Sequence, residues 1–552
     1  MRGLMMDRPL LIGSLIRYAA EYHGDTEIVT RTVEGPIERY SYAAAERRAK
    51  QLARGLQRLG VKLGDRVATI AWNTQRHFEL YFAISGIGAV CHTINPRLFA
   101  DQLSYIVNHA EDKVMFLDLT FVPIAEKMAA LWSPVEHYVI MTDRAHMPQT
   151  SLSGALCYEE LVAGEKPELD WPDFDENTAS SLCYTSGTTG NPKGALYTHR
   201  STVLHSYAVC SANAVAISMR DSILPVVPMF HVNAWGIPYA AAMSGAKLVF
   251  PGPKLDGASL YELFESEKVT LSLGVPTVWL GLLQYLEQTG KRIDGVDRVT
   301  VGGSAAPAAM IQAFEEKYGV QCIHGWGMTE MSPVGTLGLP KAKFLARSKA
   351  EQLARKAMQG FPLYGVDMKV VGPDGKPQPH DGKSSGELHV RGPWIVSGYF
   401  NDEKATQAAF DDEGWFCTGD VSTIDEDGYM QIVDRSKDVI KSGGEWISSI
   451  DVENAAMGHP DVAEAAVIGV AHPKWDERPL LIVVAKPGRQ PSKADILTLL
   501  GDKIAKWQLP DDVVFVPEIP HGATGKVLKT RLREQFKDYR LPTIEPAPLR
   551  EA

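Results

Sequence analysis

The residues whose types are best suited to binding or catalysis lie in one loop, residues 184–194, with the sequence YTSGTTGNPKG. Glycine has no Cβ atom, so Gly187, Gly190 and Gly194 let backbone N–H groups approach an anion closely. Hydroxyl and ammonium groups add further donors, from Thr185, Ser186, Thr188, Thr189 and Lys193. An ordinary surface turn needs no such density of donors beside a lysine. The composition therefore predicts a loop that binds phosphate.

The spacing of this loop differs from that of the P-loop of kinases and GTPases. In a P-loop, lysine and then serine or threonine follow the second glycine directly. Here Asn191 and Pro192 follow Gly190, and Gly194 follows the lysine. A P-loop kinase or GTPase is therefore disfavoured.

Two further motifs, GWGMTE at 325–330 and TGD at 418–420, and one arginine carry groups suited to a nucleotide. In residues 325–330, GWGMTE, the glycines would let a flat purine lie against the backbone and Trp326, and Glu330 could bind a magnesium ion whose other contacts are phosphate oxygens and a hydroxyl. Asp420 could accept two hydrogen bonds from ribose hydroxyls, and Arg435 could donate a pair to ribose or phosphate. Taken alone, GWGMTE could be a turn capped by a solvated Glu330, and Asp420, which follows Gly419, could be an ordinary turn residue.

Residues 302–307, GGSAAP, follow a predicted strand and have only small side chains. Small residues leave room for a ligand at the carboxyl edge of an open α/β sheet, although close packing of strand and helix would explain them equally. The segment lacks the closing glycine of a GxSxG nucleophile elbow, which weakens a hydrolase interpretation.

Three other segments are ambiguous by themselves. Lys526 ends a glycine-flanked loop, and an exposed lysine is usually just solvated. His231 and Trp235 lie in VPMFHVNAW, where a histidine among apolar residues is more often a core residue than a catalyst. The glycines of residues 441–446, KSGGEW, could belong to a plain loop.

The elements that must position these groups alternate along the chain. Apolar spacings of three and four, followed by Gly60, predict a helix over 42–60. Helices are also predicted at the N-terminus and over 79–90, 201–216 and 260–267, and strands over 67–72, 114–118, 138–141, 222–227 and 299–302. Such alternation indicates α/β layers around a largely parallel sheet.

The pattern of predicted elements changes towards the C-terminus. Strands predicted over 368–371 and 386–390, separated by turns, indicate a β-rich subdomain over about 361–433. The charged sequence DRSKDVIK follows, and we place a domain boundary there. The fold class is thus α/β: a large N-terminal domain (1–433) of α/β layers with its β-rich subdomain, a hinge (434–437) and a small mobile α+β domain (438–552).

Composition limits the class of protein. The 552 residues carry a net charge of −11, which argues against a general nucleic-acid binder. The six cysteines form no CxxC pair, so reduced thiols in a reducing compartment are expected. Neither a cleavable leader nor a transmembrane segment is predicted, because the stretch 222–246, although free of Asp, Glu, Lys and Arg, contains many prolines and glycines.

The motifs together, in this order over nearly the whole chain, resemble those of the adenylate-forming superfamily. Eleven matching positions at 184–194 are far more specific than a lone GxGxxG. The resemblance implies ATP, Mg²⁺ and coenzyme A as cofactors, Thr185 and Glu330 as the metal-linked pair, and Lys437 as the hinge residue. It implies catalytic roles for Lys526, at the carboxylate and α-phosphate, and for His231, Thr185 and Glu330.

The resemblance also implies the remaining contacts. Cofactor contacts fall on Thr185, Ser186, Gly187, Thr188, Thr189, Gly190, Lys193, Gly303, Ser304, Ala305, Gly325, Trp326, Gly327, Met328, Thr329, Asp420, Ile432, Arg435, Lys441, Gly443, Gly444, Glu445, Trp446 and Lys526. The acid pocket falls on His231, Trp235, Gly302, Gly303, Pro307, Trp326 and Pro333. Trp326 stands where the family more commonly has tyrosine, so we expect stacking to be kept and a hydroxyl contact to be lost.

The implied activity is that of an ATP-dependent acid:CoA ligase. MFHVNAWG, GWGMTEMSP and KSGGEWISS resemble medium- and long-chain fatty acyl-CoA synthetases and, within that group, bacterial 3-methylmercaptopropionate CoA ligases. We expect a short apolar acid, and a cytoplasmic homodimer. Alternatives are a longer fatty acid, transfer to a carrier protein in trans, a luciferase-like monooxygenase, and a nucleotide sensor, against which Lys526 counts.

Overall fold

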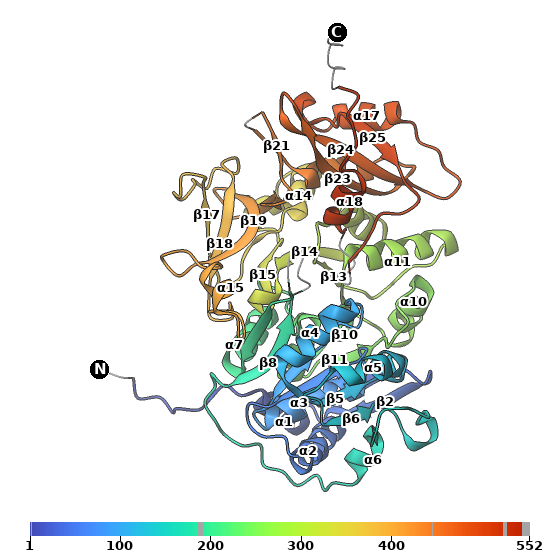
Figure 1. The fold of residues 1–552 in the computed structure, drawn as a ribbon, viewed down its shortest axis with the longest axis vertical. Helices are drawn as coiled ribbons and strands as arrows, with labels where there is room; N and C mark the ends of the chain where they lie inside the picture. Colours follow the sequence, from blue (N-terminus) through green and yellow to red (C-terminus); the bar gives the residue numbers. More distant parts are fainter. Residues whose placement is uncertain (2, 186–190, 444, 523–526, 544–552) are drawn as a thin grey trace, which may run out of the picture.

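A computed structural model of the chain describes residue 1 and residues 3–185, 191–443, 445–522 and 527–543, with the side chain of Glu445 left out. It shows a large N-terminal domain and a smaller C-terminal one, which lies at the top of Figure 1. The elements alternate as the sequence predicts, and the fold is mixed α/β.

Nine strands form one large sheet, in the order β16-β15-β14-β13-β12-β10-β11-β1-β2. The strands from β14 to β1 are parallel, and the two edges are antiparallel. The bounds are Phe361–Pro362 (β16), Val334–Leu337 (β15), Gln321–Gly327 (β14), Arg298–Val301 (β13), Leu271–Gly274 (β12), Ser222–Pro225 (β10), Lys247–Phe250 (β11), Glu27–Arg31 (β1) and Ile37–Ser41 (β2).

Seven strands form a second sheet, in the order β7-β6-β5-β3-β4-β8-β9. It is parallel except for the last pair, β8 with β9. The bounds are Leu156–Cys157 (β7), His137–Ile140 (β6), Asp112–Leu117 (β5), Arg66–Ile70 (β3), Val90–Thr93 (β4), Ala179–Tyr184 (β8) and Gly194–Thr198 (β9).

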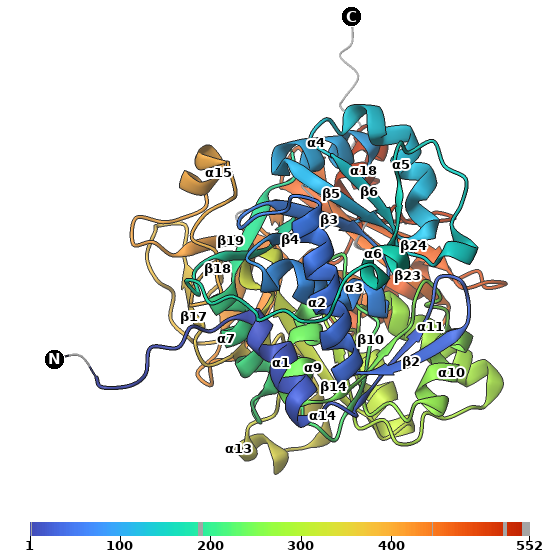
Figure 2. The same cartoon turned by 90° about the horizontal axis from the view of Figure 1, so that it is seen from below.

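One layer of helices lies between these two sheets, because α3 contacts β1 of the first sheet and β4 and β8 of the second. Figure 2 shows α1, α2 and α3 side by side. The layer consists of α1 (Ile12–Tyr22), α2 (Tyr42–Arg58), α3 (Gln75–Gly86), α7 (His199–Cys210) and α9 (Ile237–Ser244). Their buried side chains and those of both sheets form a shared core.

Other helices cover the outer faces. The nine-stranded sheet packs against α10 (Gly257–Ser266), α11 (Pro276–Thr289), α12 (Ala308–Gln312) and α14 (Lys349–Ala357), which α13 (Ala342–Leu345) precedes. The seven-stranded sheet packs against α4 (Ala100–Ala110) and α5 (Val122–Met128), and α6 (Tyr158–Ala163) contacts α2. The large domain therefore has five layers: two sheets, one layer of helices between them, and one layer of helices on each outer face. The helices predicted from apolar spacing lie in the middle layer and in the outer layers.

The β-rich region and the C-terminal region have sheets of their own. The first is antiparallel, with β17 (Asp367–Val371), β18 (Gly386–Arg391), β19 (Phe416–Ile424) and β20 (Met430–Arg435), and α15 (Glu403–Gln407) precedes β19. The second contains β21 (Ile440–Ser442), β22 (Glu445–Ile447), β23 (Val462–His472), β24 (Asp476–Ala485) and β25 (Asp512–Phe515). It packs against α16 (Ser449–Met457), α17 (Lys493–Gly501) and α18 (Lys529–Gln535).

Two predicted helices end earlier than the sequence indicates. The helix predicted over 79–90 ends at Gly86, because Gly88 adopts φ of +78° and Val90 starts β4. The helix predicted over 201–216 ends at Cys210, because Ser211 is extended. In both cases apolar residues continue beyond the helix, so the pattern hides its end.

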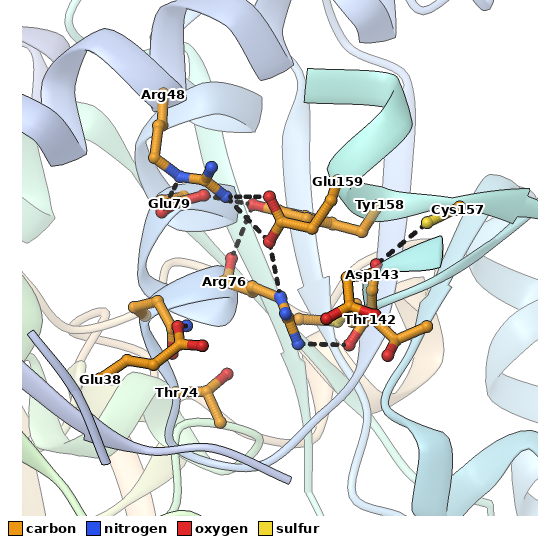
Figure 3. A network of polar contacts seen from close by, with 12 residues as sticks. Glu38, Arg48, Thr74, Arg76, Glu79, Thr142, Asp143, Cys157, Tyr158 and Glu159 are labelled. Carbon is orange, nitrogen blue, oxygen red and sulfur yellow. Dashed lines mark hydrogen bonds and ion pairs between the residues drawn. The ribbon is translucent and has the colours of Figure 1, made fainter. Parts of the chain in front are cut away.

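A partly buried network of charged groups joins α2, α3 and α6 (Figure 3). Arg48 donates to Glu79 at 2.8 Å and to Glu159 at 2.9 Å, and Arg76 donates to Glu159 at 2.8 Å. Arg76 also pairs with Glu34 at 2.7 Å, and both side chains are almost fully buried. Such pairs tolerate burial only when the charges are matched, so the network fixes the helices against one another.

Candidate active site

The predicted phosphate loop begins at the carboxyl end of β8 and leads into β9. Tyr184 pairs with Gly194 across the two strands. The N–H of Thr185 donates to the carbonyl of Lys193 at 2.9 Å, and the N–H of Lys193 donates to Oγ1 of Thr185 at 3.2 Å. The two ends of the loop are thus held together at the edge where open α/β sheets bind ligands. The loop residues Ser186, Gly187, Thr188, Thr189 and Gly190 lie outside the described residues.

Lys193 and Glu330 meet at Tyr399, a residue that the sequence analysis did not single out. Nζ of Lys193 lies 4.8 Å from the ring centroid of Tyr399, whose hydroxyl donates to Oε1 of Glu330 at 2.7 Å. Glu330 is only 6% exposed. Burial and the charge of Glu330 raise the pKa of Tyr399 well above its ordinary value, so this hydroxyl stays a donor. The predicted phosphate-binding lysine and metal ligand therefore share one neighbour.

Trp326, Asp420 and Arg435 form a second cluster. Nε1 of Trp326 donates to Oδ2 of Asp420 at 2.9 Å, and Nε of Arg435 pairs with Oδ1 at 2.8 Å. Asp420 and Arg435 lie opposite each other on β19 and β20. Because each carboxylate oxygen can accept a second hydrogen bond, Asp420 can still receive ribose hydroxyls. Trp326 thus makes a polar contact through its indole N–H, although it lacks the hydroxyl of a tyrosine.

The strand that carries Trp326 folds back on the segment after it. A Cβ atom on Gly327 would lie 2.0 Å from the carbonyl oxygen of Pro333, and one on Gly335 would lie 2.8 Å from the Trp326 ring. The N–H of Met328 donates to the Pro333 carbonyl at 3.1 Å. Only glycine fits at such distances, so the spacing of GWGMTE has a steric reason. Thr329 is held as well, since its carbonyl accepts from the hydroxyl of Tyr197 at 2.5 Å.

The wall predicted at 302–307 follows β13 and meets Trp235. A Cβ atom on Gly302 would lie 2.9 Å from the Trp235 ring and 3.2 Å from the Gly325 carbonyl, so the glycine makes room for the indole. Gly303 adopts φ of +84°, and Gly303 and Ser304 are exposed. Ala305 and Pro307 are half-buried. Gly302 thus lies beside Trp235 where β13 ends, and the small residues 303–307 follow it.

His324 holds this wall and was missed in the sequence analysis. Its Nε2 accepts from the N–H of Ala306 at 3.2 Å, and its Nδ1 lies 2.9 Å from the Ala357 carbonyl. Burial lowers the pKa of His324 to about 4, so the ring is neutral near pH 7 and Nδ1 carries the proton. His324 directly precedes the motif at 325–330, but its partners Ala306 and Ala357 lie 18 and 33 positions away, so the sequence does not reveal its role.

Residues 232–235 form a left-handed turn, α8 (Val232–Trp235). Their φ values are 48°, 51°, 50° and 56°, and Gly236 follows at 75°. For residues other than glycine this conformation costs roughly 1–2 kcal/mol each. Backbone strain of this kind clusters at functional sites, where the surroundings hold it in place.

His231 precedes the turn and lines a cavity. The cavity is also lined by Val232, Cys183 and Tyr184, and by Thr93, Asn95, Leu98, Ile106 and Phe230. Cys183 and Tyr184 lie at the end of β8, where the phosphate loop begins. His231 thus shares a cavity with the residues from which that loop starts.

The hinge and the C-terminal residues lie around the end of β20. Lys437 is exposed, and Asp438 pairs with Arg533 of α18 at 2.6 Å. Ile432 lies in β20, half-buried. Arg531 of α18 lies 5.4 Å from the ring centroid of Phe99, so this helix faces the large domain. Lys526 lies outside the described residues.

The segment 441–446 forms the hairpin of β21 and β22 in the small domain. Lys441 is exposed and Trp446 is half-buried, and Ser442 pairs with Glu445 across the hairpin. Gly443 adopts φ of +62° against the Trp475 ring and donates its N–H to the Trp475 carbonyl at 2.8 Å. Gly444 lies outside the described residues.

Within the described part of the chain, no cluster of three or more His, Cys, Asp or Glu side chains could hold a metal ion. In the same residues, no helix combines the length and apolarity needed to cross a membrane. All six cysteines are free.

Comparison with known proteins gives consistent results. The AMP-binding enzyme family matches residues 16–400, and the AMP-binding enzyme C-terminal domain matches residues 451–526. The 3-methylmercaptopropionyl-CoA ligase of Ruegeria lacuscaerulensis is 52% identical over 98% of this chain and 99% of its own length. The medium-chain-fatty-acid--CoA ligase of Ectopseudomonas oleovorans is 51% identical over 98% of both chains. The crystal structure of the anthranilate CoA ligase AuaEII with anthranoyl-AMP shares the fold, with a TM-score of 0.84 at 24% identity over 96% of this chain and 98% of its own.

Proposed function

The chain belongs to the AMP-binding enzyme family, and from this premise we propose that it is an ATP-dependent acid:CoA ligase acting on a short apolar carboxylic acid. The carboxylate attacks the α-phosphorus of ATP and releases pyrophosphate, and the CoA thiol then displaces AMP from the acyl-adenylate. The observation that carries the proposal is the contact of Lys193 and Glu330 with Tyr399, together with the cluster of Trp326, Asp420 and Arg435. Glu330 and Trp326 belong to the same motif, so one short segment contributes to both clusters.

In this proposal the nucleotide lies between the two clusters. Lys193 and the donors at 185–190 bind the pyrophosphate end, Trp326 lies against adenine, and Asp420 with Arg435 binds the ribose. The buried carboxylate of Asp420 supports this role, because its two protein donors orient it and leave acceptor capacity.

Magnesium fits this site through Glu330 and Thr185. Mg²⁺ is usually held by one or two carboxylates together with substrate phosphates and waters, rather than by a cage of protein ligands. A single buried carboxylate beside the phosphate loop therefore suits it. When bound, the ion would offset the charge of the phosphates.

The chemistry rests on positioning and charge, without a covalent protein nucleophile. His231 abuts the acid carboxylate and Trp235 bounds the acid pocket against Gly302. Lys526 offsets the charge that develops at the α-phosphorus, and one such contact typically contributes about 10² to 10³ in rate. These roles are carried over from the family resemblance.

The two half-reactions use different parts of the small domain. We propose boundaries at 1–433, 434–437 and 438–552, with rotation about Lys437 bringing residues 441–446 to the site for the thiol. The exposed side chain of Lys437 at the end of β20 supports this hinge.

The acid is proposed from the relatives. Both 3-methylmercaptopropionate and medium-chain fatty acids are indicated, at nearly equal identity. A hydrophobic pocket distinguishes one methylene by only about 1–3 kcal/mol, so several acids of neighbouring length should react. A carrier-protein acceptor is the alternative to free CoA.

One experiment tests the proposal. Straight-chain acids from acetate to hexadecanoate, and 3-methylmercaptopropionate, are assayed for CoA-dependent AMP formation. We expect the highest kcat/KM for the thioether acid or a medium-chain acid. If AMP formation requires the acid and a carrier protein but not CoA, the result would favour transfer of the acyl group to a carrier protein. If no acid-dependent AMP forms, the proposal is refuted.

We also propose a location and an assembly. Six free cysteines suit a reducing compartment, so we propose the cytoplasm. A homodimer stays a prediction, which light scattering of the purified protein would test.

A further inference from the structure

The left-handed turn of residues 232–235 connects two parts of the active site. At its start, His231 and Val232 line a cavity that is also lined by Cys183 and Tyr184. At its end, Trp235 lies against Gly302 of the acid wall. The geometry of this turn therefore sets where the acid pocket stands relative to the phosphate loop.

One side chain of the turn is anchored to both neighbouring strands. Nδ2 of Asn233 donates to Oγ of Ser181 on β8 at 3.1 Å, and Oδ1 accepts from Oγ1 of Thr93 on β4 at 3.3 Å. The thiol of Cys183 lies 3.5 Å from the same oxygen. All these side chains are buried, Asn233 at 3% exposure. The amide thus bridges β4 and β8 immediately before the phosphate loop.

Asparagine also suits the backbone at this position. Among residues with a Cβ atom, asparagine enters the left-handed region most readily. Its flanking residues, Val232 and Ala234, do not share this preference, so their conformation depends on what surrounds them. The hydrogen bonds of Asn233 lie at the centre of the strained segment, where they can hold both neighbours.

We infer that Asn233 is a positioning residue for the carboxylic acid, which fixes Trp235 relative to the phosphate loop. The inference rests on the proposed function. Asn233 does not touch the reacting atoms; it acts through Trp235. Loss of its amide should therefore loosen the acid pocket and leave the ATP site unchanged, because the ends of the phosphate loop are held by the hydrogen bonds between Thr185 and Lys193.

The test separates the side chain from the backbone. Asn233→Gly keeps the left-handed conformation without strain and removes the amide. We expect KM for the acid to rise at least about tenfold and the difference in kcat/KM between neighbouring chain lengths to shrink, with KM for ATP within about twofold of the unaltered protein. Lys268→Gly, at an exposed left-handed position (φ 53°) between α10 and β12, is the matched control and should change neither constant.

A double-mutant cycle tests the route through Trp235. In a Trp235→Ala background, Asn233→Gly should change KM for the acid less than about threefold, because the side chain that it positions is gone. If Asn233→Gly folds poorly, Thr93→Val removes one donor from the same amide and should show a smaller rise in the same constant.

Three results would overturn the inference. They are an unchanged acid KM and chain-length profile in Asn233→Gly, a parallel rise in the KM values for acid and ATP, or full additivity with Trp235→Ala. Failure of the proposed function is a different outcome, because the unaltered protein would then form no acid-dependent AMP at all.

Discussion

Tyr399→Phe should weaken MgATP use and leave the acid site intact. The variant removes one hydroxyl, which donates to Glu330 at 2.7 Å, and keeps the ring over which Lys193 lies. A hydrogen bond to a charged group contributes about 1.5–3 kcal/mol. Since 1.36 kcal/mol corresponds to a factor of ten, we expect kcat/KM for MgATP to fall about 10- to 150-fold.

The assay is acid-dependent release of pyrophosphate, measured against MgATP, free Mg²⁺ and acid in turn. The apparent affinities for MgATP and Mg²⁺ should fall, because Glu330 loses the donor that orients it, whereas KM for the acid should stay within about twofold. Tyr429→Phe is the matched control: its hydroxyl donates to the Leu339 carbonyl at 2.6 Å, away from Glu330, so only stability should change. Unchanged MgATP and Mg²⁺ dependence in Tyr399→Phe would refute the assigned role of Glu330.

Three further predictions concern other parts of the chain. Lys526→Ala should abolish acid-dependent pyrophosphate release, with a loss of about 10² or more, while thioester formation from supplied acyl-adenylate continues; near-normal pyrophosphate release would contradict the assignment. Lys437→Pro should stiffen the hinge, so that adenylation continues and transfer to CoA falls; equal loss of both steps would argue against rotation. Arg76→Ala should lower the free energy of unfolding by about 3–5 kcal/mol at pH 7 in urea titrations, because buried Glu34 loses its partner. Burial acts to raise the pKa of Glu34, but Arg76 and Thr142 lower it overall, so the stabilisation is present above about pH 4.5 and is lost as the pH falls through the folded-state pKa. The deficit of the variant should therefore shrink below pH 4.5, and a loss under 1 kcal/mol at pH 7 would contradict the expectation.

Features encoded within a few neighbouring residues could be predicted from the sequence. The layered α/β fold follows from alternating apolar periods, and Gly60 marks the end of α2 as expected. Helix ends at Gly86 and Cys210 were missed, because apolar residues continue the pattern beyond each helix.

The residues that support the site could not be found this way. Tyr399 is 69 positions from Glu330, and Asn233 is 52 positions from Ser181. A hydrogen bond over such a distance leaves no periodic trace in a single sequence. The left-handed turn is hidden for another reason: valine and alanine give no signal for a conformation that only their surroundings impose.

The strand β20 has a practical consequence for exchanging small domains between relatives. Arg435 ends this strand, pairs with Asp420 in register, and stands two positions before Lys437. A junction placed before Arg435 would replace half of the proposed ribose contact together with the transplanted domain. We therefore expect chimeras joined after Ser436 to keep the ATP affinity of the recipient, and chimeras joined upstream of β20 to inherit a mismatched nucleotide site.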